Sequence, residues 1–292
     1  MSINYQKTVK YGEGKSKKMT FNVEVFNSAG EVVDVSARRK ITNKSFYDFD
    51  NGYMPESEWC GNFKTFEEVK TAMREGYQPT VDKLKGAFKA NLAGQAKRIS
   101  FFNDVVGFAP IVPLALMGVP TAMQNSYMKP IKAKVVDVYY DMSCCCDVTS
   151  AQIIKAGQDV LGALLELEMQ GYKFNLYAIQ SYSDSSSSDV LCTKIKSSNT
   201  PLDLKRISFP LTHTAYFRCI GFDWYSKTPK GKYRIGYGRD ICRDQGVEDA
   251  QDAFRELFGR NSVIFFADKL RKESLEYIKS TICDSSKAVK AR

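Results

Sequence analysis

Apolar and polar positions follow two different periods in the second half of the chain. KVVDVYYD (134–141) predicts a strand, and residues 149–170 predict a helix, because apolar residues recur there every three or four positions. Thr149 or Ser150 suits the start of that helix, and Gly171 suits the position after its end. The same patterns predict strands at 174–181, 190–196, 232–238 and 262–267, helices at 247–258 and 269–282, a polar loop at 181–189, and a helix broken by Pro210 within 202–225.

The first half of the chain gives weaker signals. Its first eighteen residues are polar and basic and predict an extended arm, and residues 19–38 predict a β-hairpin with its turn at Asn27–Gly30. Thr65 and Glu68 form the sequence of a capping box, so a helix is expected from there to Gly76, followed by a second helix over 80–93. Residues 105–123 contain three prolines and predict an extended, buried connector that is too broken to span a membrane.

This alternation of strands and helices predicts an α/β fold, α+β overall. We expect an open, largely parallel sheet with flanking helices, preceded by an N-terminal β-hairpin arm and a helical segment. The change of pattern near residue 131 predicts two domains. Residues 1–130 would hold the basic arm, the hairpin and the helical region, and residues 131–292 the α/β domain.

Composition and charge narrow the class of protein. The chain has 292 residues, of which 43% are hydrophobic and 12% aromatic, as in a globular protein, and its net charge of +9 favours acidic partners. Eight cysteines and the lack of an apolar leader predict free thiols in a reducing cytoplasm. The only histidine, His213, stands among apolar residues, which favours a core position over a catalytic base. We therefore expect no enzyme activity and no cofactor.

One candidate metal site lies where the strand at 134–141 ends. Asp141 and Ser143 are spaced as D-x-S, and ligands of α/β proteins bind beyond the carboxyl ends of strands. Oxygen ligands suit Mg²⁺, but the next alternate position is Cys145, whose thiol is a poor magnesium ligand. Two interpretations stay open at this point: a metal site, and a strand-to-helix turn without metal chemistry.

A second set of candidates concerns interfaces. Basic residues cluster near the N-terminus, where residues 1–44 hold nine Lys/Arg against four Asp/Glu. Three interpretations stay open for this segment: it binds nucleic acid, it docks on another protomer or an acidic partner, or it is a solvated, positively charged arm. Cys283, after the last predicted helix, is expected to be accessible and able to bridge two copies in an oligomer. The candidate interface residues are Lys15, Lys17, Lys18, Arg38, Arg39, Lys40 and Cys283.

Four stretches together resemble a family of uncharacterised phage-encoded proteins: 62–77, 108–123, 141–179 and 202–222. Around Asp141 the pattern also resembles a degenerate form of the von Willebrand factor A-type domain, whose metal-ion-dependent adhesion site holds Mg²⁺. More weakly, the size, basic arm, α/β body and C-terminal cysteine resemble the Gabija anti-defence proteins of phages. Those proteins assemble into oligomers around a bacterial nuclease complex and block its access to DNA.

These resemblances imply a phage protein that acts in the host cytoplasm. The leading hypothesis is a non-enzymatic, homo-oligomeric binding protein that occludes a bacterial defence complex. One alternative is a nucleic-acid-binding accessory protein of phage replication or packaging, and another is a metal-binding, von Willebrand factor A-like interaction module. None of the three requires a membrane.

Overall fold

The computed structural model describes residues 2–42, 48–55, 59–82, 99–128, 134–144, 148–184, 186–228, 241–259, 261–270 and 273–288. The chain divides into two compact units. The larger comprises Met1–Asn91 and Lys134–Arg292, and the smaller comprises Leu92–Ala133. This division differs from the predicted boundary at residue 130, because the N-terminal strands belong to the same sheet as the strands of the second half.

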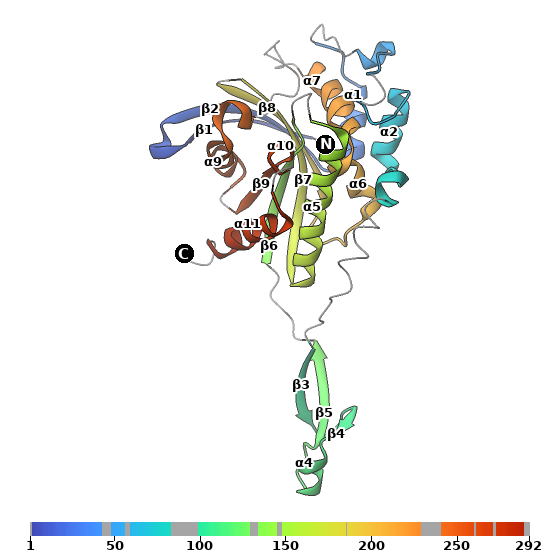
Figure 1. Cartoon of the computed structure of the whole chain (residues 1–292), viewed down its shortest axis with the longest axis vertical. Helices are drawn as coiled ribbons and strands as arrows, with labels where there is room; N and C mark the ends of the chain where they lie inside the picture. Colours follow the sequence, from blue (N-terminus) through green and yellow to red (C-terminus); the bar gives the residue numbers. More distant parts are fainter. Residues whose placement is uncertain are drawn as a thin grey trace. The chain divides into compact units, whose positions relative to one another are not determined.

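A six-stranded sheet forms the centre of the larger unit (Figure 1). Its strands are β1 (Ile3–Tyr11), β2 (Lys17–Phe26), β6 (Lys134–Asp141), β7 (Tyr172–Ser183), β8 (Ser187–Lys196) and β9 (Ser262–Phe266). They lie in the order β1-β2-β8-β7-β6-β9. The pairs β2–β8, β6–β7 and β6–β9 are parallel, whereas β1–β2 and β7–β8 are antiparallel. The predicted α/β class with a mostly parallel sheet and an N-terminal hairpin is confirmed.

Helices cover both faces of this sheet. One core contains residues of α1 (Ala29–Ala37), α2 (Phe66–Glu75), α5 (Ser150–Met169), α6 (Leu204–Thr212), α7 (Phe222–Ser226), α10 (Ala267–Leu270) and α11 (Leu275–Ala288). The other core lies under α8 (Ile241–Gln245) and α9 (Val247–Phe258). Between α6 and α7 the chain forms a π-helical turn at Tyr216–Gly221. Sheet residues alternate between the two cores, as Tyr139 and Tyr140 of β6 do.

The N-terminal hairpin is formed by different residues from those predicted. β2 pairs with β1, while the predicted return strand around Val32 and Val33 is the helix α1. Ser28 caps this helix by accepting a hydrogen bond from the Glu31 N–H, and Val32 and Val33 face the core. The first residues are therefore not an extended arm: Val9 and Tyr11 of β1 are buried against α9.

The predicted flexible loop at 181–189 is also wrong. β7 runs to Ser183 and β8 begins at Ser187, so the two strands are joined by a tight turn. The Asp184 carboxylate accepts hydrogen bonds from the N–H groups of Ser186 and Ser187, at 2.7 and 2.6 Å, and so closes the turn. Because the connection is this short, β8 runs antiparallel to β7.

The other element predictions have mixed outcomes. Both capping sequences are confirmed, since Thr65–Glu68 and Thr149–Gln152 form complete capping boxes on α2 and α5. The helix predicted within 202–225 is interrupted, but the break follows Thr212: Pro210 lies inside α6, and the π-helical turn and α7 come after it. The predicted helix at 80–93 lies largely outside the described residues, and the predicted strand at 232–238 lies wholly outside them.

The smaller unit contains a three-stranded sheet with one short helix. Its elements are β3 (Ile99–Asp104), β4 (Ala109–Pro110), α4 (Val112–Leu116) and β5 (Met123–Met128), with β5 between the other two strands. The prediction of a buried connector is wrong here, because residues 101–126 include no buried side chain. In the described part of the chain, no helix is long and apolar enough to cross a bilayer.

Gly157 permits the close packing of α5 on α6. A Cβ atom at this position would lie 2.2 Å from the Leu211 carbonyl oxygen. We expect Gly157→Ala to lower the free energy of unfolding by about 1–3 kcal/mol through overpacking. Helix propensity alone would have the opposite effect, because it favours alanine over glycine by about 1 kcal/mol.

Urea denaturation followed by circular dichroism measures this difference. Gly30→Ala in α1 is the matched control, because its added Cβ meets nothing closer than the Arg74 side chain at 3.7 Å. The control should leave stability unchanged or raise it by up to about 1 kcal/mol. A Gly157→Ala protein as stable as the wild type would contradict the packing described for α5 and α6.

Candidate functional site

The predicted pair Asp141 and Ser143 lies in a buried turn at the carboxyl end of β6. One Asp141 carboxylate oxygen accepts a hydrogen bond from the Ser143 N–H at 2.9 Å, and the other accepts one from the Ser181 hydroxyl at 2.6 Å. The Ser143 hydroxyl oxygen in turn accepts the Ser181 N–H at 2.7 Å. Both predicted side chains are fully buried, so this arrangement ties the end of β6 to β7.

Burial raises the pKa of Asp141 to about 6, although the hydrogen bonds from Ser181 and Ser143 act in the opposite direction. The Asp141 carboxylate and Ser143 hydroxyl oxygens, which could bind Mg²⁺, already accept hydrogen bonds within this turn. In the described part of the chain, no group of three or more His, Cys, Asp or Glu residues is arranged to hold a metal ion. Cys145, the third position of the pattern, lies outside the described residues, so metal binding stays a prediction.

The basic residues of the hairpin contact the chain's own acidic helix. Lys15 lies 3.2 Å from Glu256 and Lys17 lies 2.5 Å from Asp249, both on α9. Lys18 is exposed. Two of the three predicted interface lysines thus dock β1–β2 on α9, and sequence spacing gave no sign of these partners because they are more than 200 positions away.

The basic residues after α1 divide into two environments. Arg38 and Lys40 are exposed, whereas Arg39 pairs with Glu24, a buried carboxylate on β2. Arg39 donates to both oxygens of Glu24, at 2.5 and 2.8 Å, and the Trp224 indole N–H donates to one of them at 2.8 Å. Burial by itself would raise the pKa of Glu24, but these hydrogen bonds hold it below its usual value.

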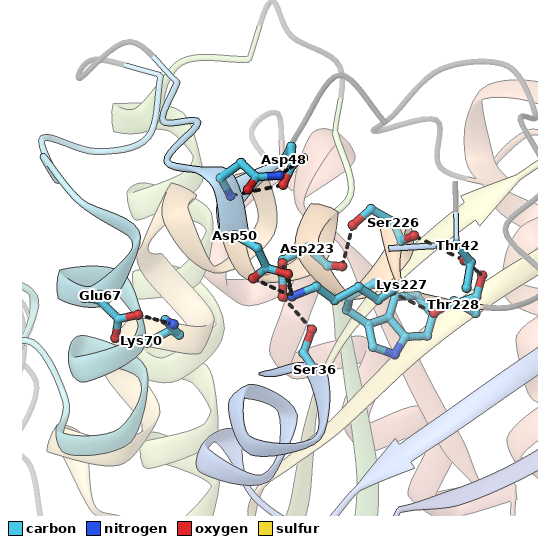
Figure 2. A network of polar contacts seen from close by, with 12 residues as sticks. Ser36, Thr42, Asp48, Asp50, Glu67, Lys70, Asp223, Ser226, Lys227 and Thr228 are labelled. Atoms are coloured by element: carbon cyan, nitrogen blue, oxygen red, sulfur yellow. Dashed lines mark hydrogen bonds and ion pairs between the residues drawn. The ribbon is translucent and has the colours of Figure 1, made fainter. Parts of the chain in front are cut away.

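A second buried ion cluster joins α1, α7 and a short turn at Phe49–Asn51. Figure 2 shows the Lys227 ammonium group between the carboxylates of Asp50 and Asp223, at 2.9 and 2.8 Å. The Ser36 hydroxyl donates to Asp223 at 2.5 Å. Burial would lower the pKa of Lys227, but the two carboxylates outweigh it and hold the pKa above its usual value. The ammonium is therefore charged and fixed, as in a structural ion pair.

His213 and Cys283 occupy packed positions. His213 is buried among Phe63, Tyr77 and Phe209, and its Nδ1 accepts a hydrogen bond from the Ala215 N–H at 3.2 Å. This confirms the core position predicted for it. Cys283 does not follow the last helix but lies within α11, half-buried, where its sulfur accepts a 3.5 Å hydrogen bond from the Tyr172 hydroxyl. An interprotomer bridge through Cys283 stays a prediction.

The most distinctive surface of the chain is apolar and lies on the smaller unit. Eight of the twelve large hydrophobic side chains that are exposed among the described residues belong to it: Phe101, Phe102, Val105, Val106, Phe108, Val112, Leu116 and Met117. We call these eight residues the apolar surface. Sequence reasoning missed it by assuming that a hydrophobic run is buried. A signal was present, since residues 99–128 contain a single charged residue, Asp104.

The raised pKa of Asp141 predicts a pH-dependent stability. A carboxyl group whose pKa is higher in the folded state favours folding at low pH, and this contribution is lost as pH rises from about 4 to about 6. We expect the free energy of unfolding to fall by up to about 3 kcal/mol over this window. Asp141→Asn keeps the shape without the titration, so its profile should be flatter.

Urea unfolding at pH 4 to 7 measures both profiles. Asp34→Asn removes an exposed carboxylate of α1 and should retain the wild-type slope. Identical slopes for the wild type and Asp141→Asn would show that Asp141 ionises normally in the fold.

The ion cluster in Figure 2 predicts a large effect of removing its cation. Lys227→Met leaves Asp223 buried without its partner, so we expect a loss of about 3–5 kcal/mol of stability. Lys155→Met, which removes an exposed pair with Asp159, is the matched control and should cost less than about 1 kcal/mol. Equal losses in thermal unfolding would contradict the buried, fixed state of Lys227.

Comparison with known proteins adds a family but no activity. No curated protein and no solved structure matches the chain significantly. A family model described as "Domain of unknown function (DUF7192)" matches residues 10–266. This match spans five strands of the six-stranded sheet, β2 and β6 to β9, together with the smaller unit, whereas most of β1 precedes it. The chain therefore belongs to the DUF7192 family.

Proposed function

We propose that this chain is a non-enzymatic binding protein that acts by protein–protein contact through the apolar surface of the smaller unit. The observation that carries the proposal is that this unit exposes eight large hydrophobic side chains and has no buried residue within 101–126. So many large apolar side chains exposed on one small unit favour an interaction site, because monomeric proteins rarely leave much apolar area together in water.

Folding energetics support a partner for this unit. The third strand of this unit, β4, has only two residues, so the sheet is close to a two-stranded hairpin, which without a hydrophobic core is marginally stable at best in water. Phe101 and Phe108 contact each other with ring centroids 6.2 Å apart, yet each remains about 60% exposed. Covering such side chains with a protein surface would stabilise the unit and the complex together.

The chemistry of the surface indicates an apolar partner. Asp104 is the only charge in residues 99–128, whereas charged residues make up 26% of the chain. A nucleic-acid site would need cations here to neutralise phosphates, and the unit's described strands and helix supply none. Contact with a protein is therefore favoured over contact with DNA or RNA for this surface.

The identity of the partner rests on the resemblance to Gabija anti-defence proteins. We propose that the chain is phage-encoded, assembles as a homo-oligomer in the host cytoplasm and covers a Gabija-type nuclease complex. The smaller unit would make the contact. The inhibition would then be steric, without turnover.

This proposal predicts the effect of charges placed on the apolar surface. Val106 and Leu116 are 74% and 83% exposed, so Val106→Asp and Leu116→Asp should leave the body folded. The double variant should lose co-purification with a tagged Gabija complex from nuclease-treated lysate. It should also lose protection of a Gabija-sensitive phage in a plaque assay.

Ile3→Asp is the matched control, because Ile3 is 60% exposed but lies on β1 of the larger unit. It should retain wild-type binding and protection. Failure of the wild-type chain to bind the complex would overturn the Gabija assignment. Binding that survives the double variant but is lost in Ile3→Asp would place the contact on the six-stranded body.

A further inference from the structure

A cavity of about 590 Å³ opens where the parallel strands β2 and β8 end. Its walls include Asn27, which follows β2, Lys196, the last residue of β8, and Thr200, which follows β8. Two arginines also line the cavity: Arg74 at the end of α2 and Arg206 on α6. Ligands of open α/β sheets bind in the crevice beyond the carboxyl ends of strands, and this cavity occupies that place. Its volume lies in the range of small-molecule sites.

The charged groups of this cavity favour an anion. Four cations, Arg74, Lys194, Lys196 and Arg206, line it together with one carboxylate, Asp203. Both arginines pair with exposed acids, Arg74 with Asp34 at 2.7 Å and Arg206 with Asp203 at 3.5 Å. Such exposed pairs contribute little stability, so either guanidinium can turn to a bound anion at small cost. Arginine also matches phosphate geometry with two parallel hydrogen bonds.

Lys196 is a buried cation of the lining, and Glu168 compensates its charge. Its side chain is 2% exposed and its ammonium group lies 2.7 Å from Glu168 of α5. The same ammonium donates to the carbonyl oxygens of Phe174 and Ser197. These contacts hold Lys196 in place, while the two arginines at the rim are exposed.

A second large cavity has two cations that are held by buried carboxylates. It measures about 570 Å³ and lies over the polar face of β1 and β2, beside Arg39, Lys40 and Lys227. Arg39 is held by the buried Glu24, and Lys227 by Asp50 and Asp223. If a bound anion drew Arg39 or Lys227 away, the buried carboxylate of Glu24 or Asp223 would lose its cation, which is costly. The cavity at the ends of β2 and β8 is therefore the better receptor for an anion.

Apolar residues form another part of the lining. Met73, Ile195 and Ile207 contribute to its surface, beside the two arginines. A ligand that fits both parts carries an anionic group for the arginines and an apolar group for this wall. We propose that the cavity binds a small phosphate-bearing molecule with an aromatic ring, the chemistry of a nucleotide.

Isothermal titration calorimetry of the full chain with ATP, pyrophosphate and adenosine tests this proposal. ATP should bind most tightly, because it alone provides both the phosphates and the ring. Arg74→Gln combined with Arg206→Gln should weaken ATP binding at least tenfold. Arg38→Gln is the matched control, since Arg38 is exposed at the end of α1 and does not line the cavity.

Four results would overturn the proposal. The first is no saturable heat with ATP. The second is adenosine binding as tightly as ATP, which would remove the role of the arginines. The third is an equal loss of ATP affinity in Arg38→Gln and in the double variant. The fourth is binding of a short single-stranded DNA that is tighter than that of ATP and is retained by the double variant. Either of the last two would indicate diffuse attraction to a basic surface. None of these depends on binding to a defence complex, so this test and the previous one fail separately.

Discussion

The parallel pairing of β2 with β8 is the constraint on which the larger unit depends. Seven residue pairs, from Thr20–Ser187 to Phe26–Thr193, join the N-terminal hairpin to strands that lie more than 150 positions later in the chain. This pairing places Glu24 under Trp224 and directs the chain from the end of β2 into α1. It also brings together the two strand ends at which the 590 Å³ cavity opens.

Buried charges fix the helices of one face to this sheet. Glu24 links β2 to Arg39 and α7, and Lys227 links α7 to the turn at Phe49–Asn51, where Asp50 lies (Figure 2). Ion pairs of this kind contribute little net stability compared with apolar packing, because desolvation is expensive. Their value lies in geometry: other packings of α1 and α7 would leave these charges unpaired.

Local sequence patterns predicted much of the fold. The parts that they missed depend on contacts between residues far apart in the sequence. Periodicity and caps identified β6, α5 and α9, because each buries a regular apolar face. Residues 29–37 were misinterpreted because Val32, Val33 and Val35 suit a strand as well as a helix, and the Ser28 cap decides between them. For the candidate site, Asp141 and Ser143 were correctly placed together at a strand end, whereas their buried contacts with Ser181 depend on β7. The apolar surface was missed because hydrophobicity alone cannot distinguish a core from an interface.

The central claim is that this apolar surface is covered by a protein partner. The most direct measurement is the heat-capacity change when the purified chain binds a purified Gabija nuclease complex, obtained by calorimetry at several temperatures. Burial of the apolar side chains predicts a clearly negative change, because apolar hydration is lost. Binding with no negative heat-capacity change, or no binding at all, would contradict the account.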